Sequence, residues 1–381
     1  MKKKIIHIIT KLELGGAQEN TIYTVRNLNK EIFDTILVFG PGGILDEEVL
    51  KDNRIKKIVC KNLLRQISPL NDIIAFFNII QILKKEKPDI IHSHSSKAGI
   101  LARLAGIFFP KIKKIHTYHG FGFNKNQNFI VRYFYIFLER FTAIFTDFFI
   151  FVSKANMSEA ESLNIGNKKR YILLRSGIKL ALYKEIKKDY RELEKFTDKK
   201  ADKMIVSLGN FKPQKNPDDF YEVAKKVLSQ KDVLFIYIGG GERLGEFREK
   251  AKKDGISEKC IFTDWLKEPY KILALCDIFI LTSLWEGLPR SLVEAMSCGL
   301  APICYKTDGV CDIINNGVNG YLIEQGDKQG MAEKIKFLIE NENEYLKIKD
   351  NVSKTDLAEF DIDNMVRRQE ELYLKISFIK I

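Results

Sequence analysis

The sequence predicts an α/β protein with two doubly wound domains that face each other across a cleft. Short apolar runs alternate with amphipathic segments of helical period, which is typical of a parallel sheet covered by helices on both faces. The alternation stops in a charged stretch at residues 184–203 and then restarts. The chain has 381 residues, and a usual size of about 100–200 residues per domain favours two domains over one.

The first half of the chain contains most of the expected elements of one sheet. Runs rich in β-branched and aromatic residues predict strands, at residues 4–9, 35–39, 55–59, 89–92, 114–118, 148–152 and 171–174. Helical periodicity predicts helices that end near residue 28 and span residues 69–87, 97–107 and 129–145.

The second half repeats the pattern. Strands are expected at residues 204–208, 233–238, 260–262, 278–281 and 301–304. Helices are expected at residues 217–228, 244–253, 270–275, 289–298, 328–340 and 361–377. Because the charged stretch reads as a linker, we expect an N-terminal domain at 1–190 and a C-terminal domain at 191–355. A C-terminal helix within 356–381 is expected to pack back toward the N-terminal domain.

Composition narrows the class of protein. A formal charge of +12 favours an anionic partner, but no RNA-recognition pattern is visible and we expect no nucleic acid. The six cysteines form no Cys-x-x-Cys pair and no zinc spacing, which indicates a reducing compartment. No apolar run has the length of a secretion signal core or a membrane span, so we expect a cytoplasmic protein.

Two carboxylates flank the start of one predicted helix. Glu286 follows an apolar strand, and Glu294 lies inside the helix after a Gly-Leu-Pro turn. The helix start between them offers unpaired backbone N–H groups and the positive end of a dipole, which suits a phosphate. The alternative is an ordinary strand, turn and helix with two solvated glutamates.

The whole string from Glu286 to Gly299 is more specific than the pair alone. Two glutamates with seven residues between them, with Gly-Leu-Pro after the first and Ala-Met-x-x-Gly after the second, resemble the signature of retaining glycosyltransferases of family four. The resemblance implies the GT-B fold, with two Rossmann-like domains, and a nucleoside-diphosphate sugar as donor. It implies no other cofactor and no bound metal. A nicotinamide-dependent oxidoreductase is disfavoured because no G-x-G-x-x-G follows the first strand.

The same resemblance assigns residues to the donor diphosphate. The family has a glycine loop after the first strand, here at Gly16, and a glycine wall beside the nucleotide, here at Gly240. It also has an arginine and a lysine that grip the diphosphate. Lys215 matches the lysine, whereas Asn210 stands where the family has the arginine. Lys212 is a nearby cation that could take the arginine's role. Without the resemblance, Lys215 would read as a solvated surface lysine.

Three residues lie by resemblance around the sugar. Glu286 and the backbone of Gly287 and Leu288 are expected to hold the sugar hydroxyls, and Glu294 the ribose hydroxyls. A carboxylate suits a diol because it accepts from two neighbouring O–H groups. No protein nucleophile is evident, so we expect front-face displacement in which the leaving phosphate acts as the base.

His119 ends a predicted strand in a Thr-Tyr-His-Gly string that resembles the family's strand-end histidine beside the reacting sugar. His92-Ser93-His94 ends the neighbouring strand and is expected to support the loop around His119. A three-histidine metal site is the alternative. The expected catalytic residues are His119 and Glu286.

An aromatic, basic segment at residues 124–145 bears on the acceptor. Phe134, Phe137 and Phe141 recur at helical spacing, which would suit a core face. Aromatic residues on the other faces, with Lys125 and two arginines, suit an anionic membrane instead. We therefore expect peripheral binding at the inner face of the cytoplasmic membrane and a glycan or lipid-linked acceptor in surface polysaccharide assembly. The competing hypothesis is a catalytically weakened homologue that acts as a basic membrane- or glycan-binding module.

Overall fold

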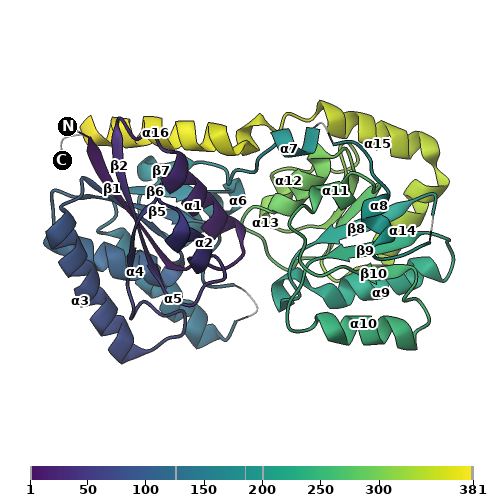
Figure 1. The fold of residues 1–381 in the computed structure, drawn as a ribbon, viewed down its shortest axis with the longest axis horizontal. Helices are drawn as coiled ribbons and strands as arrows, with labels where there is room; N and C mark the ends of the chain where they lie inside the picture. Colours follow the sequence, from purple (N-terminus) through teal and green to yellow (C-terminus); the bar gives the residue numbers. More distant parts are fainter. Residues whose placement is uncertain (1, 125–126, 185, 200, 379–381) are drawn as a thin grey trace. The chain divides into compact units, whose positions relative to one another are not determined.

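The structure, a computed structural model, describes residues 2–124, 127–184, 186–199 and 201–378. Contacts divide the chain into two compact units. The first contains the residues up to Gly177 and those from Ile362 onward, and the second contains Ile178–Asp361. Figure 1 shows the two units in the colours of the sequence.

The described part of the first unit contains a parallel sheet of seven strands in the order β3-β2-β1-β4-β5-β6-β7. The strands are β1 (Lys3–Lys11), β2 (Phe33–Gly40), β3 (Lys56–Val59), β4 (Ile90–His94), β5 (Lys113–Tyr118), β6 (Phe148–Phe151) and β7 (Tyr171–Leu173). Their carboxyl ends lie at one edge of the sheet, where ligands of doubly wound sheets bind.

Helices cover both faces of this sheet. They are α1 (Gly16–Asn27), α2 (Asp46–Lys51), α3 (Pro69–Glu86), α4 (Ser96–Ala105), α5 (Phe129–Ala143), α6 (Lys154–Ser162) and α16 (Ile362–Phe378), with 3₁₀ turns η1 (Gly106–Phe108) and η2 (Lys168–Arg170). Alternate residues of β1 serve opposite faces, as the strand period requires. Ile6 and Ile8 pack with α3 and α4, whereas Ile5 packs with α16.

Helix α16 belongs to the first unit although it follows the second in sequence. Met365, Val366 and Ile376 are buried with the strand residues Ile90 and Ile115. Figure 1 shows α16, in yellow, above the upper ends of β1 and β2.

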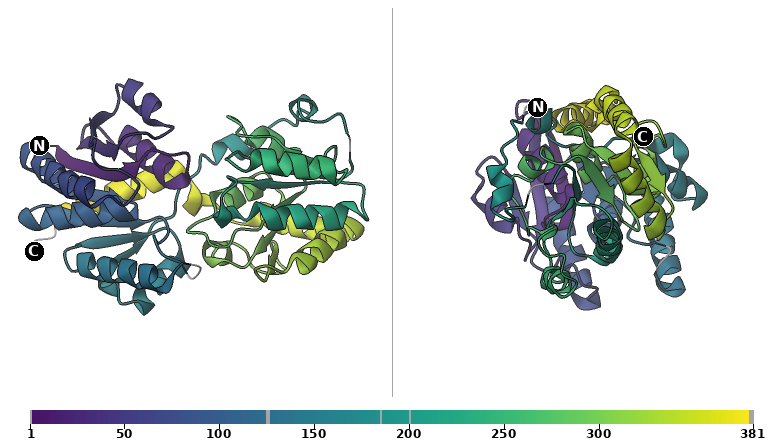
Figure 2. Two further views of the ribbon diagram at one scale, coloured as in Figure 1. Left: turned by 90° about the horizontal axis from the view of Figure 1, so that it is seen from below. Right: turned by 90° about the vertical axis from the view of Figure 1, so that its right-hand side faces the viewer.

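The described part of the second unit contains a parallel sheet of six strands in the order β10-β9-β8-β11-β12-β13. The strands are β8 (Met204–Leu208), β9 (Leu234–Ile238), β10 (Cys260–Phe262), β11 (Ile278–Leu281), β12 (Ala301–Tyr305) and β13 (Tyr321–Ile323). Helices lie on both sides of the sheet (Figure 2). They are α7 (Ala181–Lys184), α8 (Arg191–Glu194), α9 (Pro217–Leu228), α10 (Leu244–Lys253), α11 (Tyr270–Leu273), α12 (Arg290–Ser297), α13 (Asp308–Cys311), α14 (Lys328–Glu340) and α15 (Glu342–Lys354), with 3₁₀ turns η3 (Pro213–Lys215) and η4 (Ala358–Phe360).

The predicted α/β class with two parallel sheets is confirmed. Contacts group the predicted linker, residues 184–203, with the second unit. Its short helix α8 buries Leu193, and Phe196 lies beside Leu266 and Ile272. The contact division therefore falls at Gly177 and Asp361 rather than at residues 190 and 355. Residues 379–381 lie outside the described part of the chain.

Candidate active site

The two predicted carboxylates lie at the carboxyl edge of the second sheet. Glu286 is on the loop between β11 and α12, and Glu294 is inside α12. Both residues are buried, with 6% and 8% of their surfaces exposed, so the alternative of two solvated glutamates was wrong. Buried carboxylates are rare unless they are paired or hydrogen-bonded.

Glu286 is paired with Lys215. The Lys215 Nζ lies 2.5 Å from the Glu286 Oε1, and the lysine side chain is 17% exposed. The backbone carbonyls of Lys215 and Asn216 also accept hydrogen bonds from the Thr282 hydroxyl at 3.1 and 3.0 Å. The loop after β8 and the end of β11 are thus joined by a buried ion pair and a side chain-to-backbone contact.

Glycines let the loops of this edge approach each other. A side chain at Gly309 would meet the Gly287 carbonyl oxygen at 2.2 Å, so the turn after Glu286 packs directly on α13. Gly239 has φ +141° and lies against the Gly209 carbonyl, where a Cβ would stand at 1.8 Å. A Cβ at Gly240 would meet the Asp264 carboxylate at 2.2 Å and the Trp265 ring at 2.7 Å. The backbone contacts require glycine at Gly309 and Gly239, whereas a side chain at Gly240 would require the Asp264 and Trp265 side chains to shift.

Several buried polar atoms at this edge have no hydrogen-bond partner among the residues that the structure describes. They are Asn210 Oδ1, Ser283 Oγ, Ser291 Oγ and Thr307 Oγ1, and they follow β8, β11, the Glu286 loop and β12. An unsatisfied buried polar group costs about 1–3 kcal/mol. A polar ligand at this edge would remove that cost.

The first unit carries the other predicted site residues. Gly16 begins α1 directly after β1 and its loop, and His119 follows the last residue of β5. The Nε2 atom of His119 lies 3.1 Å from Nδ1 of His94. His94 therefore contacts the histidine that it was expected to support.

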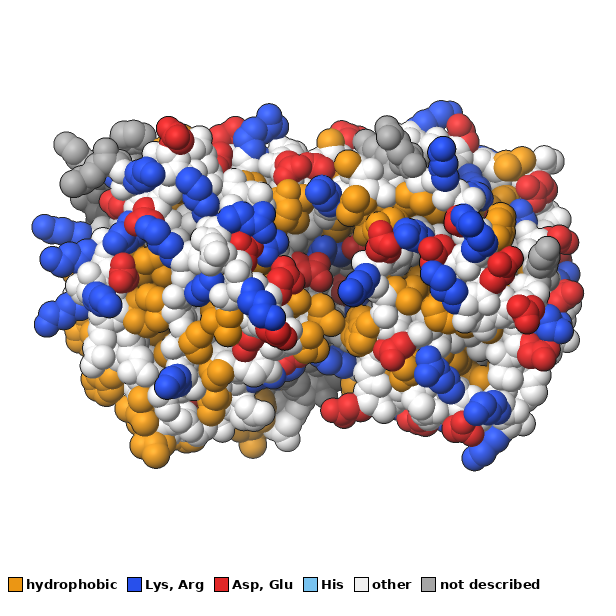
Figure 3. Space-filling model, viewed as in Figure 1, with side chains coloured by type: hydrophobic (Ala, Val, Ile, Leu, Met, Phe, Trp, Pro, Cys, Tyr) orange, Lys and Arg blue, Asp and Glu red, His pale blue; other side chains and the backbone are white. Residues whose placement is uncertain are grey.

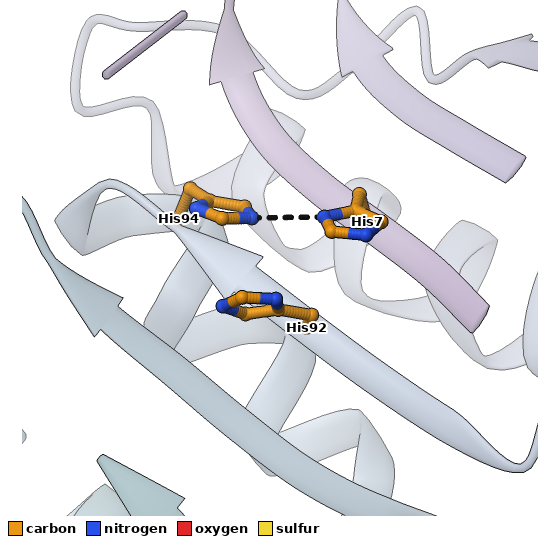
Figure 4. A group of neighbouring side chains, drawn as sticks. All are labelled: His7, His92 and His94. Carbon is orange, nitrogen blue, oxygen red and sulfur yellow. Dashed lines mark hydrogen bonds between the residues drawn. The ribbon is translucent and has the colours of Figure 1, made fainter. Parts of the chain in front are cut away.

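A cluster of histidines extends from this contact into the core. Nε2 of His94 lies 3.1 Å from Nδ1 of His7 on β1 (Figure 4). His92 contacts Tyr373 of α16 at 2.5 Å through Nδ1 and Thr117 at 2.6 Å through Nε2. Burial lowers the pKa of His7 to about 3, with a smaller effect of Lys30, and burial likewise lowers the pKa values of His92 and His94 well below the ordinary value.

This cluster differs from the metal alternative of the sequence analysis. The group with ligand atoms close enough for a metal ion is His7, His92 and His94, within 4.8 Å of one another, not the predicted set with His119. Both ring nitrogens of each member already face a hydrogen-bonding partner. The arrangement therefore needs no metal to satisfy its polar atoms. Sequence analysis missed His7 and Tyr373. The sign of His7 was a single polar residue that interrupts the apolar run of β1.

Helix α5 is held by a buried ion pair. Arg103 of α4 donates to Glu139 at 2.7 Å, and the Tyr118 hydroxyl donates to the same carboxylate oxygen at 2.7 Å. The buried residues of α5 are Ile136, Glu139, Thr142 and Ala143. The core-face interpretation of Phe134, Phe137 and Phe141 was wrong, because they are 57%, 61% and 43% exposed.

Comparison with known protein families identifies the class of protein. Residues 14–180 match the model described as Glycosyltransferase Family 4, and residues 189–355 match the model described as Glycosyl transferases group 1. The chain is 30% identical over 337 residues to the UDP-Gal:α-D-GlcNAc-diphosphoundecaprenol α-1,3-galactosyltransferase of Escherichia coli, covering 86% of this chain and 85% of that protein. The chain belongs to glycosyltransferase family 4 and is a retaining, nucleotide-sugar-dependent glycosyltransferase.

Two further similar proteins are less identical in sequence to this chain. An N,N′-diacetylbacillosaminyl-diphospho-undecaprenol α-1,3-N-acetylgalactosaminyltransferase of Campylobacter jejuni is 25% identical, covering 86% of this chain and 88% of that protein. Among solved structures, HepE of Anabaena in complex with UDP and glucose superposes with a TM-score of 0.82 at 19% identity, covering 98% of this chain and all of the other. That likeness confirms the GT-B fold. In the described residues, no helix combines the length and the apolar character needed to cross a membrane.

Proposed function

We propose that this glycosyltransferase moves a sugar from a UDP-sugar to a saccharide linked to a lipid diphosphate, at the inner face of the cytoplasmic membrane. The observation that carries the donor half is the Lys215–Glu286 pair, whose glutamate lies on the loop before α12, together with the burial of Glu294 inside that helix. The two relatives named above act, by their names, on diphosphoundecaprenol-linked saccharides, which supports this class of acceptor.

The residues of the second unit would hold the donor. An ammonium group has three N–H donors, so Lys215 can keep its bond to Glu286 and still donate to a diphosphate oxygen. The N-terminal end of α12 adds backbone N–H groups and a positive partial charge. Glu294 would accept from the ribose hydroxyls, and Glu286 with the backbone of Gly287 and Leu288 would bind the sugar hydroxyls. Gly240 would let the backbone close on the nucleotide.

Negative charge develops on the diphosphate as the bond from sugar to phosphate breaks. Fixed donors that face this charge lower the barrier without reorganising. Lys215, the α12 terminus and the backbone at Gly16 would supply such donors. In front-face displacement the leaving phosphate oxygen takes the proton of the acceptor hydroxyl. His119 of the first unit would bind beside the reacting sugar.

The acceptor half rests on an exposed apolar surface of the first unit, here called the apolar face. Its members lie on α3 and the preceding residue Ile67, on η1 and on α5: Ile67, Leu70, Ile73, Phe77, Ile107, Phe108, Phe129, Ile130, Tyr133, Phe134, Phe137 and Phe141. Phe76 of α3 contacts Phe108 of η1, and α4 contacts both α3 and α5. Figure 3 shows hydrophobic side chains gathered over the lower margin of this unit. Exposed apolar patches of this extent mark protein or membrane contacts.

Basic side chains border the apolar face. Arg140 is exposed on α5, and Arg132 lies over the Tyr133 ring, while Lys125 lies outside the described residues. A cation near an anionic membrane surface contributes about 1 kcal/mol. Apolar side chains with flanking arginines suit the boundary between acyl chains and anionic headgroups, which supports a lipid-linked acceptor over a soluble one.

A transfer assay tests the proposal. The full chain is incubated with a panel of UDP-, GDP-, dTDP- and ADP-sugars and with lipid-diphosphate saccharides of one and two sugars, and products are identified by mass spectrometry. We expect one UDP-sugar to give an α-linked product. A soluble saccharide used as well as its lipid-linked form would contradict the acceptor assignment. Donor binding without transfer to any acceptor would favour the weakened homologue.

A further inference from the structure

The five histidines of the chain all lie in the first unit, on or directly after β1, β4 and β5. Four are buried, and His119 is half-buried at the sheet edge. In the register of the sheet, His7 lies opposite His92, and His94 lies opposite Thr117. Neighbouring parallel strands therefore bring the rings of His7, His92 and His94 together on the face of the sheet that α16 covers.

These contacts form one unbranched series of hydrogen-bonded groups, here called the hydrogen-bond chain. It begins at His119, passes through His94 and His7 by two contacts of 3.1 Å, and reaches the Tyr373 hydroxyl at 3.3 Å from Nε2 of His7. From Tyr373 it continues to Nδ1 of His92 at 2.5 Å and ends at the Thr117 hydroxyl, 2.6 Å from Nε2 of His92. Each histidine inside the hydrogen-bond chain makes a contact through both of its ring nitrogens, and Tyr373 makes both of its contacts through its hydroxyl.

The interior groups are uncharged. Burial lowers the pKa values of His7, His92 and His94 and raises that of Tyr373, so each neutral ring has one N–H and Tyr373 keeps its O–H. Nearby charges are cationic: Lys30 acts on His7, and Arg175 lines the same small cavity as His94 and His119. His116 is the remaining neighbour, and it contacts Ser93.

Only two hydrogen arrangements of these neutral groups make every contact a hydrogen bond in which each interior N–H and O–H has an acceptor. If Tyr373 donates to His92, it accepts from Nε2 of His7, which forces His94 to donate to His7 and His119 to donate from Nε2. If Tyr373 donates to His7 instead, every bond reverses and His119 carries its hydrogen on Nδ1. The position of one hydroxyl hydrogen on α16 thus decides the tautomer of His119.

The distances favour the first arrangement. The 2.5 Å contact between Tyr373 and His92 is within the range of an O–H donor, whereas the 3.3 Å contact with His7 is at the long limit of an N–H donor. We propose that Tyr373, His7 and His94 are positioning residues for sugar transfer, which hold His119 as the Nε2–H tautomer in one ring orientation. This inference rests on the proposed role of His119 beside the reacting sugar.

Tyr373→Phe removes the hydroxyl that joins His7 to His92 in the hydrogen-bond chain. An N–H left facing the phenylalanine would be an unsatisfied buried donor, which is less tolerated than an unsatisfied acceptor. His7 should then carry its hydrogen on Nδ1 and donate to His94, and His94 should donate to His119. The variant is thus expected to change the tautomer of His119 through two intervening rings. Thr117→Val, at the other end, should cause the same change by the same argument.

Nitrogen-15 NMR of the full chain reads these tautomers directly, because only five histidines contribute signals. The matched control is Tyr23→Phe. It removes a 2.5 Å hydrogen bond between α1 and Asp363 of α16 but leaves every contact of the hydrogen-bond chain in place. We expect the His119 signals to change from the Nε2–H to the Nδ1–H pattern in Tyr373→Phe and Thr117→Val, and to stay unchanged in Tyr23→Phe. The transfer rate kcat/KM should fall by roughly 10–100-fold in Tyr373→Phe.

Each outcome decides the inference. If the tautomer of His119 changes in neither variant, the inference that the hydrogen-bond chain sets this tautomer is overturned, whatever the activity. A tautomer that switches while kcat/KM stays at the wild-type value overturns the positioning role. Stoichiometric zinc bound by His7, His92 and His94 in the purified protein would also overturn it. If the wild type transfers no sugar at all, the proposed function fails, but the NMR result still decides whether the hydrogen-bond chain sets the tautomer of His119.

Discussion

The ammonium of Lys215 lies 2.5 Å from the carboxylate of Glu286, 71 residues further along the chain. This pair joins the first loop of the second unit to the loop that precedes α12. It is largely buried, so removal of one partner leaves the other charged and poorly solvated.

The pair has a structural and a catalytic part, which a double-mutant cycle separates. Lys215→Met should lower the free energy of unfolding by about 1–3 kcal/mol, because Glu286 loses its partner in a buried place. Lys215→Met/Glu286→Gln should recover most of that stability but no transfer activity. Urea unfolding and kcat/KM measure the two effects. A double variant that regains activity would show that Lys215 acts only on stability.

Glu294 and Glu286 should fail in different ways. We expect Glu294→Ala to weaken donor binding, because it removes the proposed acceptor for the ribose hydroxyls, and Glu286→Ala to depress kcat. Donor affinity can be followed by fluorescence, since the two tryptophans, Trp265 and Trp285, lie beside Gly240 and Glu286. Glu333→Ala on the exposed side of α14 is the matched control. Near-wild-type kcat/KM in both active-site variants would refute the site assignment.

Transfer should persist in EDTA. The diphosphate site proposed here uses Lys215 and a helix terminus, and the resemblance to family four implies no bound metal. Rates are compared before and after chelation, and again after Mg²⁺ or Mn²⁺ is added. Activity that disappears in EDTA and returns with the metal would contradict the proposal.

Asn210 stands where the family has an arginine, and its Oδ1 is buried without a partner. Asn210→Arg should leave donor affinity unchanged if Lys212 already supplies the charge, and otherwise tighten it. A charge-assisted contact is worth roughly 1.5–3 kcal/mol. Asn210→Met is the control for side-chain size without charge. A marked loss of affinity in both variants would show that the amide makes a contact of its own.

Membrane binding should depend on the apolar face and on its arginines. Ile130→Ser/Phe134→Ser is expected to abolish co-sedimentation with anionic liposomes, and Arg132→Glu/Arg140→Glu to weaken it most at low salt. Leu346→Ser, which removes an exposed apolar side chain of α15 in the second unit, is the matched control. Binding of the first two variants at the wild-type level would show that the apolar face does not make the membrane contact.

The periodicity of the sequence predicted most of the fold. The strands of both sheets and the long helices fall within a few residues of their expected ranges, because buried parallel strands are continuous apolar runs. The sequence did not predict helix α15 or the three-residue strand β13. The first is strongly charged, and the second is too short for a periodic pattern.

The candidate site stays a prediction, and its sequence signal is strongest where its residues are close together in the chain. Glu286, Gly287 and Leu288 lie on the loop before α12, and Glu294 lies in that helix. The partnership of His7 with Tyr373 was not predictable, because 366 residues separate them. The exposure of Phe137 also escaped prediction. Helical spacing alone does not tell a face that packs on a sheet from one that packs on nothing in the chain.

The placement of α16 has a consequence for the order in which the chain folds during synthesis. The second unit is continuous, from Ile178 to Asp361, and all of its strands are available before α16 is made. The first unit begins the chain, yet Tyr373 and the apolar side of α16 cover its sheet only at the end. The first-made half therefore leaves the ribosome with Ile5, Ile90 and Ile115 still uncovered on one face. We expect this half to need protection from association with other chains until translation is complete.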